Sequence, residues 1–186
     1  MQNGKVIVVF GPTGVGKTTI THYLNEKWGI PQVITHTTRA PRIGEVNGQD
    51  YYFESPESFA KNHYLEDVTY AGNHYGSSWE GLERAWEHHK IASIVLDSVG
   101  AETYMKELGD DVVLLYVTIS NPKILMERLK RRGDLPAAMA KRLNSADFER
   151  DLALPDALKG KATVIKNDDW PLTKSALDRL VEKLES

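Results

Sequence analysis

Apolar runs rich in β-branched side chains mark the strands that the chain buries. The clearest are residues 5–10 (KVIVVF), 91–96 (IASIVL) and 112–119 (VVLLYVTI). Strands covered on both faces of a parallel sheet carry such runs, whereas strands with one face in water alternate between apolar and polar residues. A last short strand is predicted at 163–166, and a possible one at 33–35. The pattern therefore predicts a parallel sheet that is covered on both faces.

Segments with helical periodicity separate these strands. Predicted helices span residues 18–28, 122–132 and about 137–150, and a fourth lies near the C-terminus. The second helix opens with Pro122 after Asn121 as its cap. The fourth carries apolar side chains along one face: Leu177, Leu180, Val181 and Leu184. Strands that alternate with helices indicate an α/β fold with helices on both faces of the sheet.

The middle of the chain, from about residue 39 to 87, is rich in turns, aromatic residues and polar residues. It predicts short elements only: strands at 51–54, 69–70 and 74–75, and a helix at 56–62 that Ser55 begins as N-cap. We therefore expect one domain with a small α+β insertion at 36–87. Residues 1–35 and 88–186 then form the core, which includes a helical lid at about 127–150.

The composition narrows the classes of partner. With a net charge of −3, the chain has no overall basic excess of the kind that nucleic-acid binding uses. It has no cysteine, which excludes disulfides, thiolate metal sites and cysteine catalysis. The apolar run at residues 6–10 is too short for a signal peptide, and no run approaches the roughly 20 residues of a membrane span. We expect a soluble, cytoplasmic monomer or homodimer with no nucleic acid, no membrane and no histidine metal site.

A phosphate-binding motif follows the first predicted strand. GPTGVGKT fits the pattern G-x-x-x-x-G-K-T at every fixed position, and it lies between a buried strand and a helix, as this motif requires. Glycines let successive N–H groups point at phosphate oxygens, the lysine reaches the β- and γ-phosphates, and the threonine hydroxyl can ligate Mg²⁺. The predicted nucleoside triphosphate site consists of Gly11, Pro12, Thr13, Gly14, Val15, Gly16, Lys17, Thr18 and Thr19. The alternative is a glycine-rich turn that carries a lysine by chance.

Two arginines are held three residues apart by a proline in the next segment, HTTRAPRIGEVNGQDYYF. A guanidinium binds phosphate through two parallel hydrogen bonds, so two convergent arginines can hold a dianion. Arg39 and Arg42 around Pro41 would suit the phosphate of a nucleoside monophosphate, to which Tyr51 could donate a further hydrogen bond. Taken alone, a pair of surface arginines is more often solvated charge, and the residues by themselves leave both interpretations open.

The same segment closely resembles the guanylate kinase family, whose pattern S/H-T-T-R-x-P-R-x-G-E-x-x-G-x-D-Y-x-F it follows. Further matches run in the family's order along nearly the whole chain: GPTGVGKT, YLEDVTYAGNHYGS (64–77), LDSVGA (96–101), ERLKRRG (127–133), KRL (141–143) and VIKNDD (164–169). The arginine segment is specific to that family, whereas the phosphate loop alone is not. The resemblance implies a P-loop NTPase fold with a monophosphate-binding insertion and a lid. It also implies ATP-dependent phosphorylation of GMP assisted by Mg²⁺.

The resemblance further assigns residues to the two substrates. For GMP it implies Thr35, Arg39, Arg42, Tyr51 and Tyr75 at the phosphate, Glu66 and Ser77 at guanine, and Asp97 beside the nucleotide and the metal. For ATP and transfer it implies Lys17 with Arg128, Arg132 and Arg142 around the moving phosphoryl group, Thr18 and Asp97 at Mg²⁺, and Asn167 and Asp168 against adenine. A carboxylate suits guanine because N1–H and the N2 amino group are adjacent donors, which adenine does not offer. On the residues alone, Glu66 is an exposed acid in a loop-rich segment, and the alternative for Asp97 is a strand-end acid that caps the next turn.

The chain departs from the family pattern at two places. Where the family usually has D-x-D-x-Q-G-A, this chain has V-L-D-S-V-G-A, so Val95 replaces the first aspartate and Val99 the glutamine. After Arg132, the lid segment GDLPAAMAKRL is one residue shorter than the common form and lacks its threonine and its acidic pair. Two alternatives therefore stay open: a related P-loop kinase with another nucleotide acceptor, and a non-catalytic guanylate kinase-like binding module.

Overall fold

A four-stranded parallel sheet forms the centre of the computed structural model, which describes residues 4–131 and 136–186, without the side chains of residues 122, 138 and 142. Its strands are β1 (Lys5–Phe10), β6 (Ile91–Val95), β7 (Val112–Thr118) and β8 (Thr163–Lys166), in the order β6-β1-β7-β8. All neighbouring strands pair in parallel. The apolar runs of the sequence thus predicted all four strands, and the α/β fold is confirmed.

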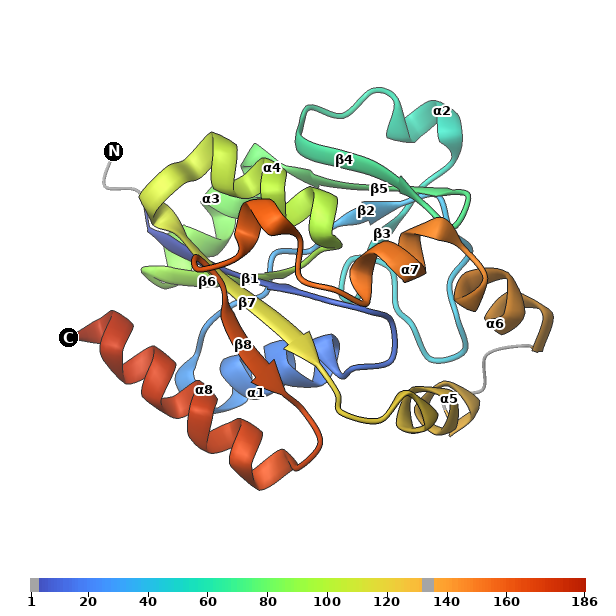
Figure 1. Ribbon diagram of the computed structural model, residues 1–186. Coiled ribbons are helices and arrows are strands. Elements are labelled where there is room, and N and C mark those ends of the chain that lie inside the picture. Colours follow the sequence, from blue (N-terminus) through green and yellow to red (C-terminus); the bar gives the residue numbers. More distant parts are fainter. Residues whose placement is uncertain (1–3, 132–135) are drawn as a thin grey trace.

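Helices cover both faces of this sheet. Figure 1 shows α1 (Lys17–Trp28) and α8 (Trp170–Glu185) on one side, with α3 (Trp79–His88) and α4 (Ser98–Leu108) on the other. The central strand feeds both layers, because alternate residues of a strand point to opposite faces. Val6, Val8 and Phe10 pack toward α3 and α4, and Ile7 and Val9 pack toward α1 and α8. From residue 6 to residue 10 this strand is fully buried on both sides, which explains the continuous apolar sequence there.

A second sheet stands apart from the first, at the upper right of Figure 1. It contains β2 (His36–Thr37), β3 (Tyr52–Phe53), β4 (Tyr64–Tyr70) and β5 (Asn73–Ser78), in the order β3-β2-β5-β4. The hairpin of β4 and β5 is antiparallel and much longer than the strand tips that the sequence predicted. The short helix α2 (Pro56–Phe59) begins at Ser55, whose hydroxyl accepts from the Ser58 N–H, as expected.

The chain passes through three short helices before β8. These are α5 (Pro122–Arg131), α6 (Pro136–Leu143) and α7 (Ala146–Asp151), and two 3₁₀ turns lie at Gly109–Asp111 and Asp156–Leu158. The prediction of one helix at 137–150 is wrong. Ser145 interrupts it, because its side chain accepts from the Phe148 N–H and begins α7 as a new N-cap.

One expected strand is absent, and two helices that the sequence did not predict are present. No strand forms at 33–35. Gln32, just before this segment, makes an isolated bridge to Ser93, and strand β2 begins at His36 instead. The helices α3 and α4 were not predicted from the sequence. Both contain glycine and β-branched or aromatic residues with modest helix propensity, so packing against the sheet stabilises them more than local preference does.

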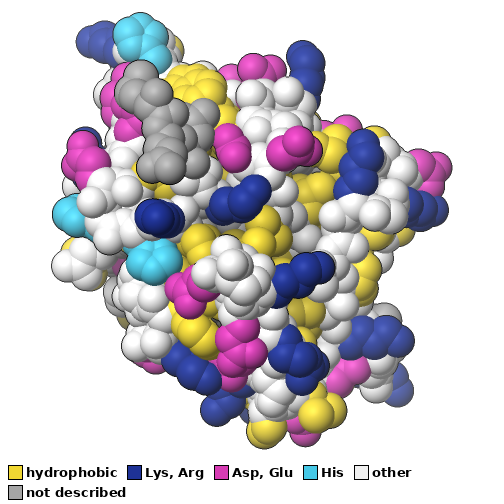
Figure 2. All heavy atoms as spheres, turned by 90° about the vertical axis from the view of Figure 1, so that its left-hand side faces the viewer, with side chains coloured by type: hydrophobic (Ala, Val, Ile, Leu, Met, Phe, Trp, Pro, Cys, Tyr) yellow, Lys and Arg dark blue, Asp and Glu magenta, His cyan; other side chains and the backbone are white. Residues whose placement is uncertain are grey.

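The described surface fits the small net charge. On the face that Figure 2 shows, Lys and Arg side chains are interspersed with Asp and Glu. None of the helices within residues 4–131 and 136–186 combines the length and the apolar character that a membrane span requires.

Candidate active site

The carboxyl ends of the parallel strands meet at one edge of the sheet, and the predicted site residues follow them. The phosphate-loop motif comes after β1, Asp97 after β6, and Asn167 after β8. Ligand sites of open α/β sheets lie at this edge. A cavity of about 490 Å³ lies there, and its wall includes both Lys17 from the loop and Tyr51 from the segment that carries the arginines.

Glycine is required at two points of the phosphate loop. Gly11 has a φ of 132°, and a Cβ there would lie 2.2 Å from the carbonyl oxygen of Val117. Gly16 has a φ of 99°, and a Cβ there would lie 2.5 Å from Nδ2 of Asn167. The loop therefore wraps tightly against β7 and against the segment after β8. Gly16 then begins α1 without a side-chain cap, so the N–H groups of the first helical turn are directed at the cavity edge.

Lys17 folds back over this loop. Its Nζ donates to the carbonyl oxygens of Gly11 and Pro12, the second at 3.0 Å. Thr13, Thr18 and Thr19 line the cavity beside it. A lysine, hydroxyl groups and helix N–H groups on one wall form a chemically suitable site for a chain of phosphates.

Arg128 and Asn167 hold the phosphate loop through hydrogen bonds to its backbone. Arg128 of α5 donates to the carbonyl oxygen of Val15 at 3.2 Å and to that of Asn167 at 2.9 Å. The Asn167 side chain donates to the same Val15 oxygen at 2.7 Å and accepts from Thr173 at 2.9 Å. Asn167 thus holds the loop in place, and the neighbouring Asp168 accepts from the Ser120 N–H at 2.8 Å.

Glu45 holds both arginines of the second segment. Arg39 forms a bidentate pair with this carboxylate, 2.9 Å for each nitrogen, and Arg42 reaches it through its backbone N–H at 2.7 Å and its guanidinium at 3.4 Å. Burial opposes ionisation of Glu45, but the hydrogen bonds from the arginines outweigh it and lower the pKa of this carboxyl. The Nε of Arg39 is buried and has no hydrogen-bond partner among the described residues. One short turn thus holds two positive charges and one negative charge in fixed positions.

The aromatic rings of two tyrosines lie next to this turn. The Arg39 guanidinium lies 5.3 Å from the centre of the Tyr51 ring, a cation–π arrangement. The rings of Tyr51 and Tyr75 meet edge to face at 6.2 Å. Burial raises the pKa of the Tyr51 hydroxyl, which therefore stays a hydrogen-bond donor at neutral pH.

A β-bulge turns Glu66 toward the interior. The pairing of β4 with β5 shifts register between Tyr64 and Glu66, so that two successive side chains, Leu65 and Glu66, are buried. Glu66 is only 4% exposed, and Ser77 donates to its Oε2 at 3.2 Å. Burial, strengthened by the negative charge of Asp97, raises the pKa of Glu66 to about 8. The site therefore holds a carboxyl group whose ionised form is short of donors.

Asp97 has two partners of its own. It caps α4 by accepting from the Gly100 N–H at 2.8 Å, as the alternative interpretation of the sequence predicted, and it pairs with Arg150 of α7 at 2.7 Å. Arg150 also contacts Asp147 at 3.0 Å and Asp151 at 3.4 Å. Burial raises the pKa of Asp97. An arginine from the lid segment is thus seated among acids at the end of β6.

The structure brings most of the predicted residues to one cavity wall, namely Thr13, Gly14, Gly16, Lys17, Thr18, Thr19, Arg128, Thr35, Arg42, Tyr51, Glu66, Tyr75 and Asp97. The other described residues of the prediction do not line this cavity, namely Gly11, Pro12, Val15, Arg39, Ser77, Asn167 and Asp168. Arg132 and the side chain of Arg142 lie outside the described residues. The sequence analysis did not identify Glu45 and Arg150. Of these residues, only Glu45 could have been found from the sequence, because it occupies a fixed position in the pattern of the arginine segment.

Comparisons with known proteins agree with this geometry. The sequence model described as guanylate kinase matches residues 3–184. A guanylate kinase of Synechocystis sp. is 35% identical, over 96% of this chain and 92% of its own length. One of Campylobacter jejuni is 34% identical, over 95% of this chain and 87% of its own length. The crystal structure of guanylate kinase from Anaplasma phagocytophilum shares the fold, with a TM-score of 0.68 at 24% identity over 98% of this chain and 87% of that one. The chain belongs to the guanylate kinase family.

Proposed function

We propose that this protein transfers the γ-phosphoryl group of ATP to GMP. The observation that carries this proposal is a shared cavity of about 490 Å³, whose wall combines the phosphate loop with Arg42, Tyr51 and Glu66. A triphosphate site and a monophosphate site that share one cavity can align donor and acceptor for in-line transfer. The relatives of known name are guanylate kinases, which favours the same donor and acceptor here.

The arginine segment is proposed to hold the phosphate of GMP. Arg39 and Arg42 are kept together by Glu45, so their guanidinium groups are already oriented and lose little freedom on binding. The neutral hydroxyl of Tyr51, which lies on the cavity wall, is a donor suited to phosphate oxygens. Thr35 and Tyr75 lie on the same wall.

Glu66 and Ser77 are proposed to select guanine. The ionised Glu66 can accept from N1–H and from the N2 amino group, and these two donors offset the burial that disfavours its charge. Adenine would leave the buried carboxylate unpaired, which costs several-fold to hundreds-fold in selectivity. At neutral pH the unliganded Glu66 keeps its proton, so the two hydrogen bonds that guanine donates must offset the loss of that proton.

Phosphoryl transfer is proposed to depend on positive charge and positioning. The GMP phosphate oxygen is already ionised, so it attacks without a general base, while Lys17 and the lid arginines Arg128, Arg132 and Arg142 neutralise the charge on the moving group. Closure of the lid at 127–150 and of the insertion at 36–87 over the core would exclude water. Cytoplasmic location and a monomeric or dimeric state stay predictions.

The residues also fit Mg²⁺ as an assistant of the reaction. Mg²⁺ usually takes one or two protein oxygens and completes its shell with substrate phosphates and water. Thr18 offers a hydroxyl on the cavity wall, whereas both oxygens of Asp97 already have protein partners. We propose Thr18 as the protein ligand and Asp97 as a carboxylate beside the metal. Bound there, the metal would neutralise phosphate charge.

The test is a coupled assay with ATP, Mg²⁺ and a panel of acceptors: GMP, dGMP, AMP, CMP and UMP. We expect GMP to be the best ribonucleotide acceptor by at least about tenfold in kcat/KM. Equal rates with the other bases would contradict the role of Glu66 and favour a kinase of altered acceptor, which the valine at position 95 makes the main alternative. Binding of GMP without any transfer would instead identify a non-catalytic module.

A further inference from the structure

One face of α4 forms the back wall of the region around Glu66. Asp97, Gly100 and Tyr104 follow each other at steps of three and four residues, so they lie along the same side of the helix. A Cβ at Gly100 would lie 2.8 Å from Oε1 of Glu66, which shows how closely the helix approaches this carboxyl. The third member of this face, Tyr104, is fully buried.

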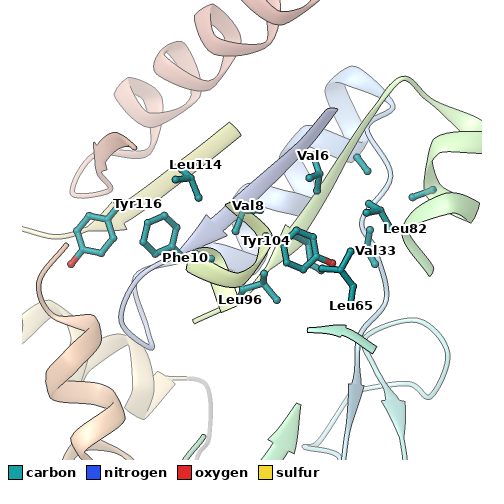
Figure 3. Close-up of a cluster of buried hydrophobic side chains, with 14 of the residues drawn as sticks. Val6, Val8, Phe10, Val33, Leu65, Leu82, Leu96, Tyr104, Leu114 and Tyr116 are labelled. Atoms are coloured by element: carbon teal, nitrogen blue, oxygen red, sulfur yellow. The ribbon is translucent and has the colours of Figure 1, made fainter. Parts of the chain in front are cut away.

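Tyr104 is an unusual core residue because its polar end points at the site. Figure 3 shows its ring among Val8, Leu96 and Leu65, with the hydroxyl directed toward Leu65, the neighbour of Glu66. The hydroxyl donates to Oγ of Ser77 at 2.8 Å. Ser77 is also fully buried, so this phenol is its fixed partner on the side away from the cavity.

The three side chains form a directed chain of hydrogen bonds. Each hydroxyl has one proton, and Glu66 can only accept in the ionised form that binds guanine. Tyr104 therefore donates to Ser77, and Ser77 donates to Glu66 at 3.2 Å. The chain fills an acceptor position of the Ser77 oxygen, so the serine proton is aimed at Oε2. With Oε2 held by Ser77 and Gly100 backing Oε1, the carboxylate has one preferred plane.

Building on the proposed function, we propose that Tyr104 is a positioning residue for base selection. It acts through Ser77 on Glu66 and fixes the carboxylate plane that accepts the two adjacent donors of a 2-amino-6-oxopurine. A hydroxyl in a fully buried place usually has a specific polar role, since phenylalanine would fill the same core space without a polar atom to satisfy. The inference extends the acceptor site by a residue that does not line the cavity.

The experiment compares Tyr104→Phe with the unchanged protein on two acceptors, GMP and IMP. IMP keeps N1–H and O6 but lacks the 2-amino group, so the GMP:IMP ratio of kcat/KM reports how well the carboxylate accepts both donors. We expect this ratio to fall about fivefold in Tyr104→Phe, the size of one lost hydrogen bond. The kcat at saturating GMP and the KM for ATP should stay within about twofold.

Tyr116→Phe is the matched control. Tyr116 lies in the same apolar layer, and its hydroxyl donates to the backbone oxygen of Asp151 at 3.0 Å. This variant also loses one buried hydrogen bond, and we expect its GMP:IMP ratio to stay unchanged. If both variants change the ratio alike, or if Tyr104→Phe leaves it unchanged, the positioning role is refuted.

A double mutant shows whether Tyr104 acts through Glu66. In a Glu66→Gln background, the further change Tyr104→Phe should leave the GMP:IMP ratio as it is, because the group that it positions is gone. A second fivefold fall would contradict the inference. The unchanged protein separates this inference from the proposed function: if it does not phosphorylate GMP, the function fails, whereas normal activity with an unaltered ratio in Tyr104→Phe rejects the inference alone.

Discussion

Replacing Glu66 by glutamine should stabilise the protein at alkaline pH while it removes guanine selection. The carboxyl is 4% exposed, and its pKa lies at about 8 instead of 4.5. Between these two values the folded protein keeps a proton that the unfolded chain has released, so the free energy of unfolding falls as pH rises. Each pH unit in this window costs about 1.4 kcal/mol, which accumulates to at most about 5 kcal/mol above pH 8. Glu66→Gln abolishes this loss, because glutamine carries no titrating proton.

Urea unfolding at pH values from 5 to 9 measures the effect. The difference in unfolding free energy between Glu66→Gln and the unchanged protein should grow in favour of the variant through this range, by a few kcal/mol in total, and then level off above pH 8. Glu87→Gln makes the same exchange on an exposed side chain of α3 and controls for the lost charge. Parallel stability profiles for Glu66→Gln and the unchanged protein would refute the reasoning that burial dominates at this site.

Three further predictions concern the phosphate loop and the lid. Lys17→Ala should lower kcat at least about 100-fold, since its charge stabilises the transferring phosphoryl group, and a coupled assay that finds normal turnover would remove it from the mechanism. Gly11→Ala should destabilise the protein by about 2–4 kcal/mol in urea unfolding, because the new Cβ meets a carbonyl oxygen at 2.2 Å in a left-handed backbone; a loss below about 0.5 kcal/mol would contradict that close approach. Arg150→Met should cost about 1–3 kcal/mol at pH 7, because it leaves the buried Asp97 without its cation. The same change in an Asp97→Asn background should cost clearly less, and equal costs in both backgrounds would show that the pair is not coupled.

The sequence predicted the elements whose physics is local. Strand β1 is covered on both faces, so every residue from 6 to 10 is apolar. This continuous apolar run was enough to predict the strand. The phosphate loop is equally local, because its glycines, its lysine and its threonine lie within eight residues. Residue identity at fixed spacing was enough to predict both features.

Helices and strands that are stabilised by contacts with residues distant in the sequence were not predicted, or were predicted only in part. The helix α4 contains Gly100 and two β-branched residues, and it forms because Asp97 caps it and Tyr104 packs into the core. The hairpin of β4 and β5 extends beyond its predicted tips because each strand is paired by the other. Such elements are stabilised by tertiary contacts that local propensity does not contain.

The missed site residues follow the same rule. Glu45 and Arg150 are charged residues in exposed-looking segments, and their roles arise from the partners that the fold brings to them. Tyr104 lies 38 residues from Glu66 in the sequence and joins it only through Ser77. A residue that acts through a second side chain leaves no motif of its own.

The valine at position 95, where the family usually has an aspartate, changes the balance of charges on the cavity wall that includes Glu66. Glu66 must ionise to accept from guanine, and the charge of Asp97 already opposes that ionisation. An aspartate in place of Val95, which lines the same cavity, would add a further acid and raise the pKa of Glu66 further. Arg150 works in the opposite direction, since its guanidinium pairs with Asp97 and reduces the negative field on its neighbour. An apolar residue at position 95 and an arginine from the lid therefore both favour the ionised form of Glu66, so the loss of the family's first aspartate is compatible with guanine binding.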